Sequence, residues 1–397
     1  MRRFIIAAIS ACLLLCAPLP ALSQSEASNS QFADKLVRQL LGVKPGDVVV
    51  INADPTHLAI TEDIAASVMA VGAFPIVSMG SNRLNRLYFE RVPARFDSQP
   101  PVGPLRLLGI ADETVSIDYP FDPSVLAGVP PSRLTVLTEA NNVQTTYVLK
   151  HNLPGISIGN GLMPSAITAK QYGVGLDVLS ALFWSGINAD YSQIHRDATA
   201  VASAMTASHS VRVTSPNGTS LTFAVTEEPA EVNDGIISAA DRVRGGTAVQ
   251  KQLPAGDVYF LPKAGSANGT LVLGDARLNG VLVSGLTFHI SNGKVTSMSA
   301  KSGLAEMNKM YQAGDAGRDE FSLVDIGTNR SMHVPAAGQL GAGPSMAAGY
   351  VTVGIGSNLF FGGNDRSSFA FESSVPNATV TVDGKRLVSG GALTPPI

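Results

Sequence analysis

The chain has 397 residues, of which 45% are hydrophobic and 15% charged, and its formal net charge is −3 at pH 7. These values are typical of a well-packed globular protein and exclude a disordered chain. No cluster of basic residues interleaved with aromatic side chains occurs, so a nucleic-acid partner is not expected. The length predicts two domains.

The first 23 residues have the pattern of a secretory signal peptide. Arg2 and Arg3 precede an apolar run over residues 4–15, and Ala21-Leu22-Ser23 supplies the small residues of a cleavage site. The apolar run is too short to cross a bilayer, which needs about 20 residues. We therefore expect a periplasmic or secreted protein without a transmembrane segment after cleavage.

Both cysteines of the chain lie in this leader. Because Cys12 and Cys16 are removed with it, the mature chain has no disulfide, no thiolate nucleophile and no cysteine metal ligand. A lipoprotein anchored at Cys16 is the alternative. It is disfavoured because Leu15 is larger than the residue that normally precedes a lipid-bearing cysteine.

The residues that follow predict alternating helices and strands. The predicted elements are a helix over 32–41, a strand over 48–51, a helix over 58–71, a strand over 74–77, a helix over 134–149, a strand over 156–158 and a helix over 166–184 that is interrupted at 173–175. Short connections between strand, helix and strand favour a parallel α/β domain, assigned to residues 24–200. No glycine-rich fingerprint follows a strand, so no nucleotide cofactor is expected.

After Asp190 the pattern changes to short strands and tight turns. One more helix is predicted over 194–207. Three hairpin turns are predicted, at Asn217-Gly218, Asn292-Gly293 and Asp383-Gly384. The second domain, residues 201–397, is thus expected to be α+β with a mostly antiparallel sheet.

A series of motifs runs through most of the chain in a fixed order. They are VKPGDVVVI, GAFPIV, MPSAITAKQYGV, LFWSGINADYSQI, VRVTSPNGTSLTF, QLPAGDVYFLP, IGTN, GYVTVGIGSNLFFGG and TVDGKRLVSGG. Together they resemble the aminopeptidase T family of metallo-aminopeptidases, in its leucyl aminopeptidase-like branch. The resemblance implies a two-domain protein, usually a homodimer, that removes N-terminal amino acids from peptides. It also implies two divalent metal ions (zinc, cobalt, manganese or magnesium) in the C-terminal domain, which activate a water molecule.

The metal-ligand positions of that family fall mostly on residues that cannot bind a metal. Carried over one at a time, they fall on Asp257, Leu323, Thr352, Leu359, Ala370 and Glu372. Thr352 and Ala370 stand in place of two histidines. Leu323 stands in place of a glutamate, and Leu359 in place of a tyrosine. Because only Asp257 and Glu372 keep a carboxylate, zinc or cobalt held by imidazole nitrogen is hard to support.

Other side chains could rebuild a cation site in the same cleft. Asp325 lies two residues after Leu323 on the same strand face, and His333 follows in the next loop. A set of Asp257, Asp325 and Glu372 would suit Ca²⁺ or Mg²⁺, which prefer oxygen ligands. The alternatives are a turn aspartate at Asp257 and a surface histidine at His333.

Two functions remain open from the sequence. The first is an exported aminopeptidase that acts through a rearranged metal site. The second is a non-catalytic protein that binds a peptide or a small molecule in the old cleft. A serine hydrolase is not supported, because Gly343-Pro344-Ser345-Met346 is not a nucleophile elbow.

Overall fold

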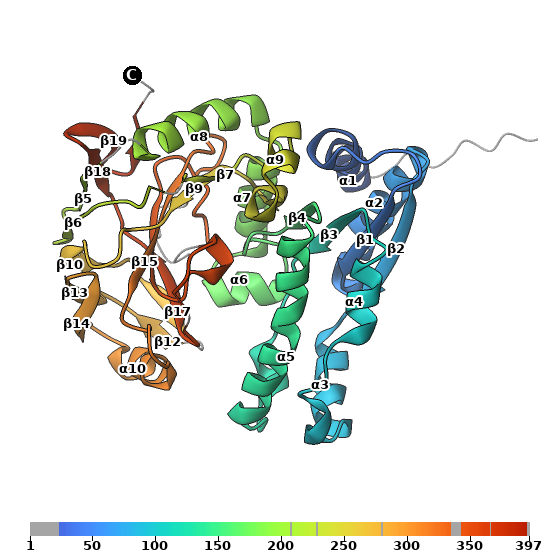
Figure 1. The fold of residues 1–397 in the computed structure, drawn as a ribbon, viewed down its shortest axis with the longest axis horizontal. Helices are drawn as coiled ribbons and strands as arrows, with labels where there is room; N and C mark the ends of the chain where they lie inside the picture. The colour runs from blue at the N-terminus through green and yellow to red at the C-terminus, as the bar shows by residue number, and fades with distance from the viewer. Residues whose placement is uncertain are drawn as a thin grey trace, which may run out of the picture.

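Figure 1 shows the fold in a computed structural model, which describes residues 24–397 except 207–208, 228, 279–280, 335–342, 366 and 395–397. The predicted signal peptide, with Cys12 and Cys16, lies outside the described residues. Among the helices that are described, none is long and apolar enough to span a membrane.

The first half of the chain builds a five-stranded parallel sheet. Its strands, in spatial order, are β2 (Phe74–Met79), β1 (Val48–Ala53), β3 (Glu113–Ile117), β4 (Gly155–Ile158) and β8 (Gln250–Leu253). Its helices are α1 (Gln24–Lys35), α2 (Leu58–Ala70), α3 (Asn82–Arg91), α4 (Val102–Leu108), α5 (Pro131–Lys150), α6 (Ala166–Tyr172) and α7 (Leu176–Ile187). Short helical turns are η1 (Leu36–Leu41), η2 (Pro55–His57), η3 (Ala94–Phe96) and η4 (Pro123–Leu126). The predicted parallel α/β arrangement is confirmed.

The two faces of the parallel sheet differ in polarity. Side chains such as Val49, Val115 and Ile156 pack into an apolar core with residues of α1, α2 and α7. Because alternate residues of a strand point to opposite faces, the second face carries the residues between them. These are mostly polar: Asn52, Thr114, Ser116, Ser157, Gln250 and Gln252. Parallel sheets are usually apolar on both faces, so this polar face is unusual.

The second half builds antiparallel sheets. An eight-stranded sheet has the order β14 (Lys294–Ser299), β13 (Thr287–Ser291), β10 (Asn268–Val272), β6 (Ser220–Phe223), β5 (Val211–Thr214), β18 (Thr379–Val382), β19 (Lys385–Ser389) and β20 (Ala392–Leu393). A five-stranded sheet has the order β17 (Ala370–Ser374), β16 (Val351–Gly356), β15 (Phe321–Gly327), β9 (Asp257–Phe260) and β7 (Glu231–Asn233). Further elements are β11 (Ala276–Leu278), β12 (Val281–Val283), α8 (Tyr191–Thr206), α9 (Ala239–Arg244), α10 (Leu304–Ala313), η5 (Gly246–Val249) and η6 (Leu359–Phe361).

The mostly antiparallel second half and its three hairpin turns are confirmed. The turns join β5 to β6, β13 to β14, and β18 to β19. A domain boundary near residue 200 stays a prediction. Strand β8 pairs with β4 in the first sheet although it follows β7 in the chain, and Met332 and Met346 pack into the first core.

Asn329 ties the two halves of the molecule together. Its side chain is fully buried, and Nδ2 donates hydrogen bonds to the carbonyl oxygens of Gly186 at 3.2 Å and Ala255 at 2.8 Å. The neighbouring Gly256 has φ +124°, and a Cβ there would lie 2.5 Å from the Asn329 side chain. This tight contact fixes the start of β9, and with it Asp257.

We expect Asn329→Ala to lower the free energy of unfolding by about 2–4 kcal/mol, because two buried carbonyl oxygens lose their donor. Urea denaturation measures the change. Asn142→Ala, on the exposed side of α5, is the matched control. An equal unfolding midpoint for the two variants would contradict the role assigned to Asn329.

Candidate functional site

The five-stranded antiparallel sheet presents one face to the core and the other to the candidate site. Val258, Val324 and Val353 pack between this sheet and the eight-stranded sheet. The strand register places the alternate residues on the opposite face. They are Glu231, Asn233, Asp257, Tyr259, Leu323, Asp325, Gly327, Thr352, Gly354, Gly356, Ala370, Glu372 and Ser374. Five of the six ligand positions implied by the resemblance therefore share one face, and Leu359 lies in η6.

Asp257, Asp325 and Glu372 form an acidic cluster on this face. Burial raises the pKa of Asp257 to about 7, and the negative charge of Glu372 adds to the shift. Burial also raises the pKa of Asp325 well above its ordinary value, and the charges of Asp257 and Glu372 raise it further. The charge of Glu372 therefore makes ionisation of both aspartates more costly.

Glu372 is the member of the cluster that solvent reaches. Its side chain is exposed, yet the protein atoms that surround it raise its pKa to about 7 by desolvation. A carboxylate on the wall of a concave site meets water from one side and protein atoms from the other, so it is both exposed and desolvated. Glu372 is therefore the entrance to the cluster.

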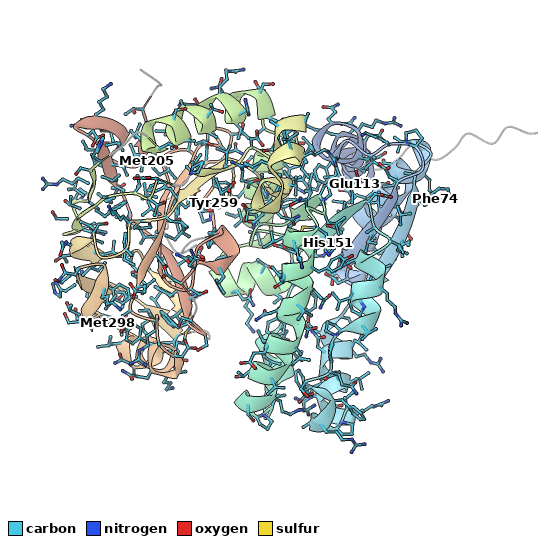
Figure 2. The ribbon with its side chains drawn as sticks, viewed as in Figure 1. Phe74, Glu113, His151, Met205, Tyr259 and Met298 are labelled. Carbon is cyan, nitrogen blue, oxygen red and sulfur yellow. The ribbon has the colours of Figure 1, made fainter. Side chains whose placement is uncertain are left out.

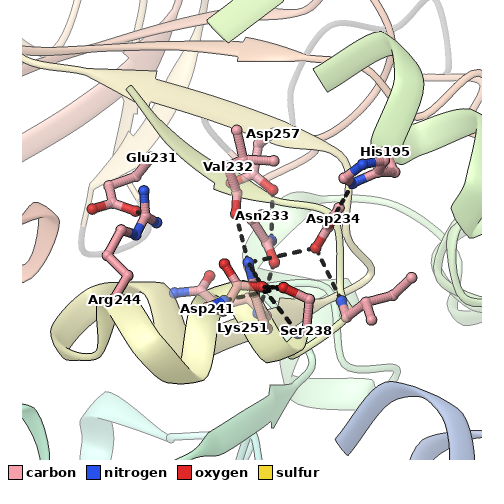
Figure 3. Close-up of polar contacts among 12 residues, drawn as sticks. His195, Glu231, Val232, Asn233, Asp234, Ser238, Asp241, Arg244, Lys251 and Asp257 are labelled. Atoms are coloured by element: carbon pink, nitrogen blue, oxygen red, sulfur yellow. Dashed lines mark hydrogen bonds and ion pairs between the residues drawn. The ribbon is translucent and has the colours of Figure 1, made fainter. Parts of the chain in front are cut away.

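A hydrogen-bond network holds Asp257 in place, as Figure 3 shows. Asn233 Nδ2 donates to Asp257 Oδ1 at 2.7 Å, and Asn233 Oδ1 accepts from the backbone N–H of Gln252 at 3.0 Å. The side chain of Lys251 is buried, and its Nζ lies 3.4 Å from Asp234 Oδ1. Its positive charge lowers the pKa of Asp257 and so partly opposes the effect of burial.

Two buried polar atoms beside the cluster have no hydrogen-bond partner among the described residues. They are Asp325 Oδ1 and Thr352 Oγ1, from residues that lie opposite each other on β15 and β16. Buried polar atoms are normally paired. On the same face, Leu323 packs against Gly354, where a Cβ would lie only 2.9 Å from the Leu323 side chain. The site thus combines two unpaired polar atoms, Asp325 Oδ1 and Thr352 Oγ1, with an apolar surface formed by Leu323.

A cavity of about 330 Å³ adjoins the cluster and includes Asp257 in its wall. Tyr259, which Figure 2 labels near the centre of the molecule, also lines it. Tyr259 packs edge-on against Phe361, with ring centroids 5.0 Å apart. A broader groove of about 1190 Å³ shares Thr247, Tyr259 and Phe361 with the cavity. Asp257 is thus the member of the acidic cluster that borders space a ligand can occupy.

A family model described as 2,5-dihydroxypyridine 5,6-dioxygenase, NicX, matches residues 189–395, which is just over half of the chain. The chain belongs to this family. A comparison with curated proteins found no match.

Two solved structures resemble this family member over nearly its whole length. Wild-type AmpT from Thermus thermophilus has a TM-score of 0.70 at 15% identity, and the match covers 93% of this chain and 100% of AmpT. The 2,5-dihydroxypyridine dioxygenase from Pseudomonas putida KT2440 has a TM-score of 0.62 at 15% identity, with 94% and 99% covered. The aminopeptidase T-like fold predicted from the sequence motifs is confirmed. At this identity the likeness shows the fold alone.

The contacts of the histidines in this family member are with residues other than the three carboxylates of the acidic cluster. His57 contacts Asp54, His151 stacks on Tyr147, His195 contacts Asp234, His209 contacts Asp383, His289 contacts Thr270, and His333 is exposed in its loop. His333 is also not among the groups that shift the pKa of Asp257 or Asp325. The grouping of His333 with the three carboxylates stays a prediction.

The donor set does not fit the zinc or cobalt that the resemblance implies. Across the described ranges, no three His, Cys, Asp or Glu side chains are placed to hold a metal ion. The site face offers Thr352 and Ala370 where imidazole ligands are expected, and Leu323 where a carboxylate is expected. Zinc and cobalt sites in proteins generally need such nitrogen donors. We therefore derive no catalytic step through a metal ion.

Proposed function

We propose that this protein is an exported binding protein for ligands with a free amino group, such as the N-terminus of a short peptide. The observation that carries the proposal is the acidic cluster of Asp257, Asp325 and Glu372 on one face of the sheet, where the charge of Glu372 raises the pKa of both aspartates. A primary ammonium group supplies one positive charge and three hydrogen-bond donors. It would lower the pKa of all three carboxylates and needs no imidazole ligand.

The relatives' names suggest two catalytic alternatives that the donor set supports less well. Peptide hydrolysis with two metal ions would need the ligands that Leu323, Thr352 and Ala370 replace. Ring cleavage of a dihydroxypyridine by a non-haem oxygenase would commonly use iron held by two histidines and one carboxylate. The site face carries no histidine.

One specific observation favours a second candidate, which is an aminopeptidase with an oxygen-ligated cation. Asp325 Oδ1 and Thr352 Oγ1 are unpaired acceptors beside two further carboxylates. Mg²⁺ accepts such ligands together with water. This candidate requires a bound cation, whereas the binding protein does not, so metal analysis distinguishes the two.

Metal analysis of the purified mature protein, combined with an aminopeptidase assay on leucyl substrates, tests the proposal. We expect less than one metal ion per chain and no turnover with added Zn²⁺, Co²⁺, Mn²⁺ or Mg²⁺. In calorimetric titrations, trialanine should bind, whereas N-acetyl-trialanine, which lacks the amino group, should bind at least tenfold more weakly. Two bound metal ions with turnover that a chelator abolishes would replace this proposal by the aminopeptidase.

Export and a homodimer are further parts of the proposal. Export rests on the leader pattern in residues 1–23, and the homodimer rests on the resemblance to the aminopeptidase T family. Cell fractionation and size-exclusion chromatography test them, and a cytoplasmic monomer would contradict both.

A further inference from the structure

The cavity beside Asp257 is bounded by the unusual polar face of the parallel sheet. Its lining includes Asn52 of β1, Ser116 of β3, Ser157 of β4 and Gln252 of β8. On the opposite side, Gln144 and Thr145 of α5 line it. Figure 1 shows α5 running between the parallel sheet and the C-terminal half.

Helix α5 covers the polar face without packing tightly on it. None of its described residues is fully buried, although a helix that covers a sheet normally buries an apolar stripe. Gly155 lies on the same face between Thr114 and Gln250, where a Cβ would be 2.5 Å from Thr114 Oγ1 and 3.1 Å from Gln250 Oε1, so a larger residue would not fit there. The polar face of the sheet thus forms one wall of the cavity, and α5 forms another.

The lining is neutral but rich in hydrogen-bonding groups. The two charged side chains in the wall are already engaged, Lys251 by Asp234 at 3.4 Å and Asp257 by Asn233 at 2.7 Å. The side-chain amide of Gln252 has no hydrogen-bond partner among the described residues, although its backbone N–H is paired. Amide side chains offer both donors and acceptors, as does each peptide unit of a ligand.

We infer that this cavity is a subsite for the peptide groups of a bound ligand. The inference rests on the proposed function, because Asp257 belongs both to the acidic cluster and to the cavity wall. A ligand whose ammonium group contacts Asp257, the cluster member in the cavity wall, therefore places its next residues between Gln252 and Thr145. A volume of about 330 Å³ is at the lower end of ligand pockets, so the subsite takes a short peptide segment.

Two variants on opposite walls test the inference. Gln252→Met keeps the length of the side chain and removes its amide, and Thr145→Val keeps the shape and removes the hydroxyl. Each should weaken trialanine binding by about three- to tenfold, the effect of one lost hydrogen bond. Alaninamide, which ends after one residue, should bind each variant within twofold of the wild type. Gln312→Met, an exposed position on α10, is the matched control, and equal melting temperatures show that the variants fold.

The outcomes separate this inference from the proposed function. If wild-type protein binds trialanine and alaninamide equally, or if both variants bind trialanine as the control does, the subsite is wrong and the amine site stands. If wild-type protein binds neither probe, the proposed function fails and the subsite fails with it.

Discussion

The free energy of unfolding is expected to fall as the pH rises from about 4.5 to 7.5, and Asp257→Asn should remove much of that fall. The pKa of Asp257 is about 7 in the folded protein and about 3.9 in an unfolded chain. Between these values the folded state binds more protons, so its stability decreases with rising pH. The full difference between the folded and unfolded pKa of Asp257 corresponds to a loss of roughly 4 kcal/mol in the free energy of unfolding, at about 1.4 kcal/mol per pKa unit.

Asp257→Asn tests this effect because asparagine keeps an acceptor for Asn233 and cannot ionise, and the loss of the Asp257 charge also makes Asp325 easier to ionise. Urea denaturation at several pH values should give a flatter profile for the variant, and a more stable protein at pH 7.5. Glu113, whose pKa burial also raises to about 7, contributes equally to both profiles and cancels in the difference. Glu62→Gln on the exposed side of α2 is the control. Parallel profiles for wild type and Asp257→Asn would show that Asp257 ionises freely in the fold.

Local patterns in the sequence were sufficient for most elements of the fold. A continuous apolar run predicted β1, the short segment Ile156-Ser157-Ile158 predicted β4, and the break at residues 173–175 correctly separated α6 from α7. Strand β3 was missed, because Thr114 and Ser116 alternate with Val115 and Ile117 and the strand lacks the continuous apolar run of a buried parallel strand. That alternation is itself the signal of the polar sheet face.

The candidate site could be predicted only in part. Ordered motifs were sufficient to select Asp257, Asp325 and Glu372, which the structure brings to one face of one sheet. Asn233 and Lys251 were missed, because their contacts with Asp257 and Asp234 depend on how β7 and β8 join two different sheets. No local pattern encodes such a contact. The alternation of polar residues in Gln250-Lys251-Gln252-Leu253 was the available hint.

Binding of an amine is expected to depend on Glu372 and on pH together. Glu372→Gln should weaken trialanine binding by about 10- to 100-fold at pH 7.5, because a charge-assisted hydrogen bond is worth about 1.5–3 kcal/mol. Because desolvation raises the pKa of Glu372 to about 7, removing its charge should not lower the melting temperature at pH 7.5. Calorimetric titration of wild type and variant measures the difference.

The pH profile of that binding separates an electrostatic role of Glu372 from a merely structural one. Glu372 and Asp257 each have a pKa of about 7, so a bound ammonium group must displace protons from them at lower pH. Affinity should therefore rise about tenfold per pH unit for each proton released, from about pH 5.5 to 7. It should fall again above about pH 8, where the α-amino group of the peptide loses its own proton. Glu372→Gln should flatten the rise, and Glu62→Gln should not. An affinity that stays constant from pH 5.5 to 7.5 in the wild type would contradict recognition of the ammonium group by this cluster.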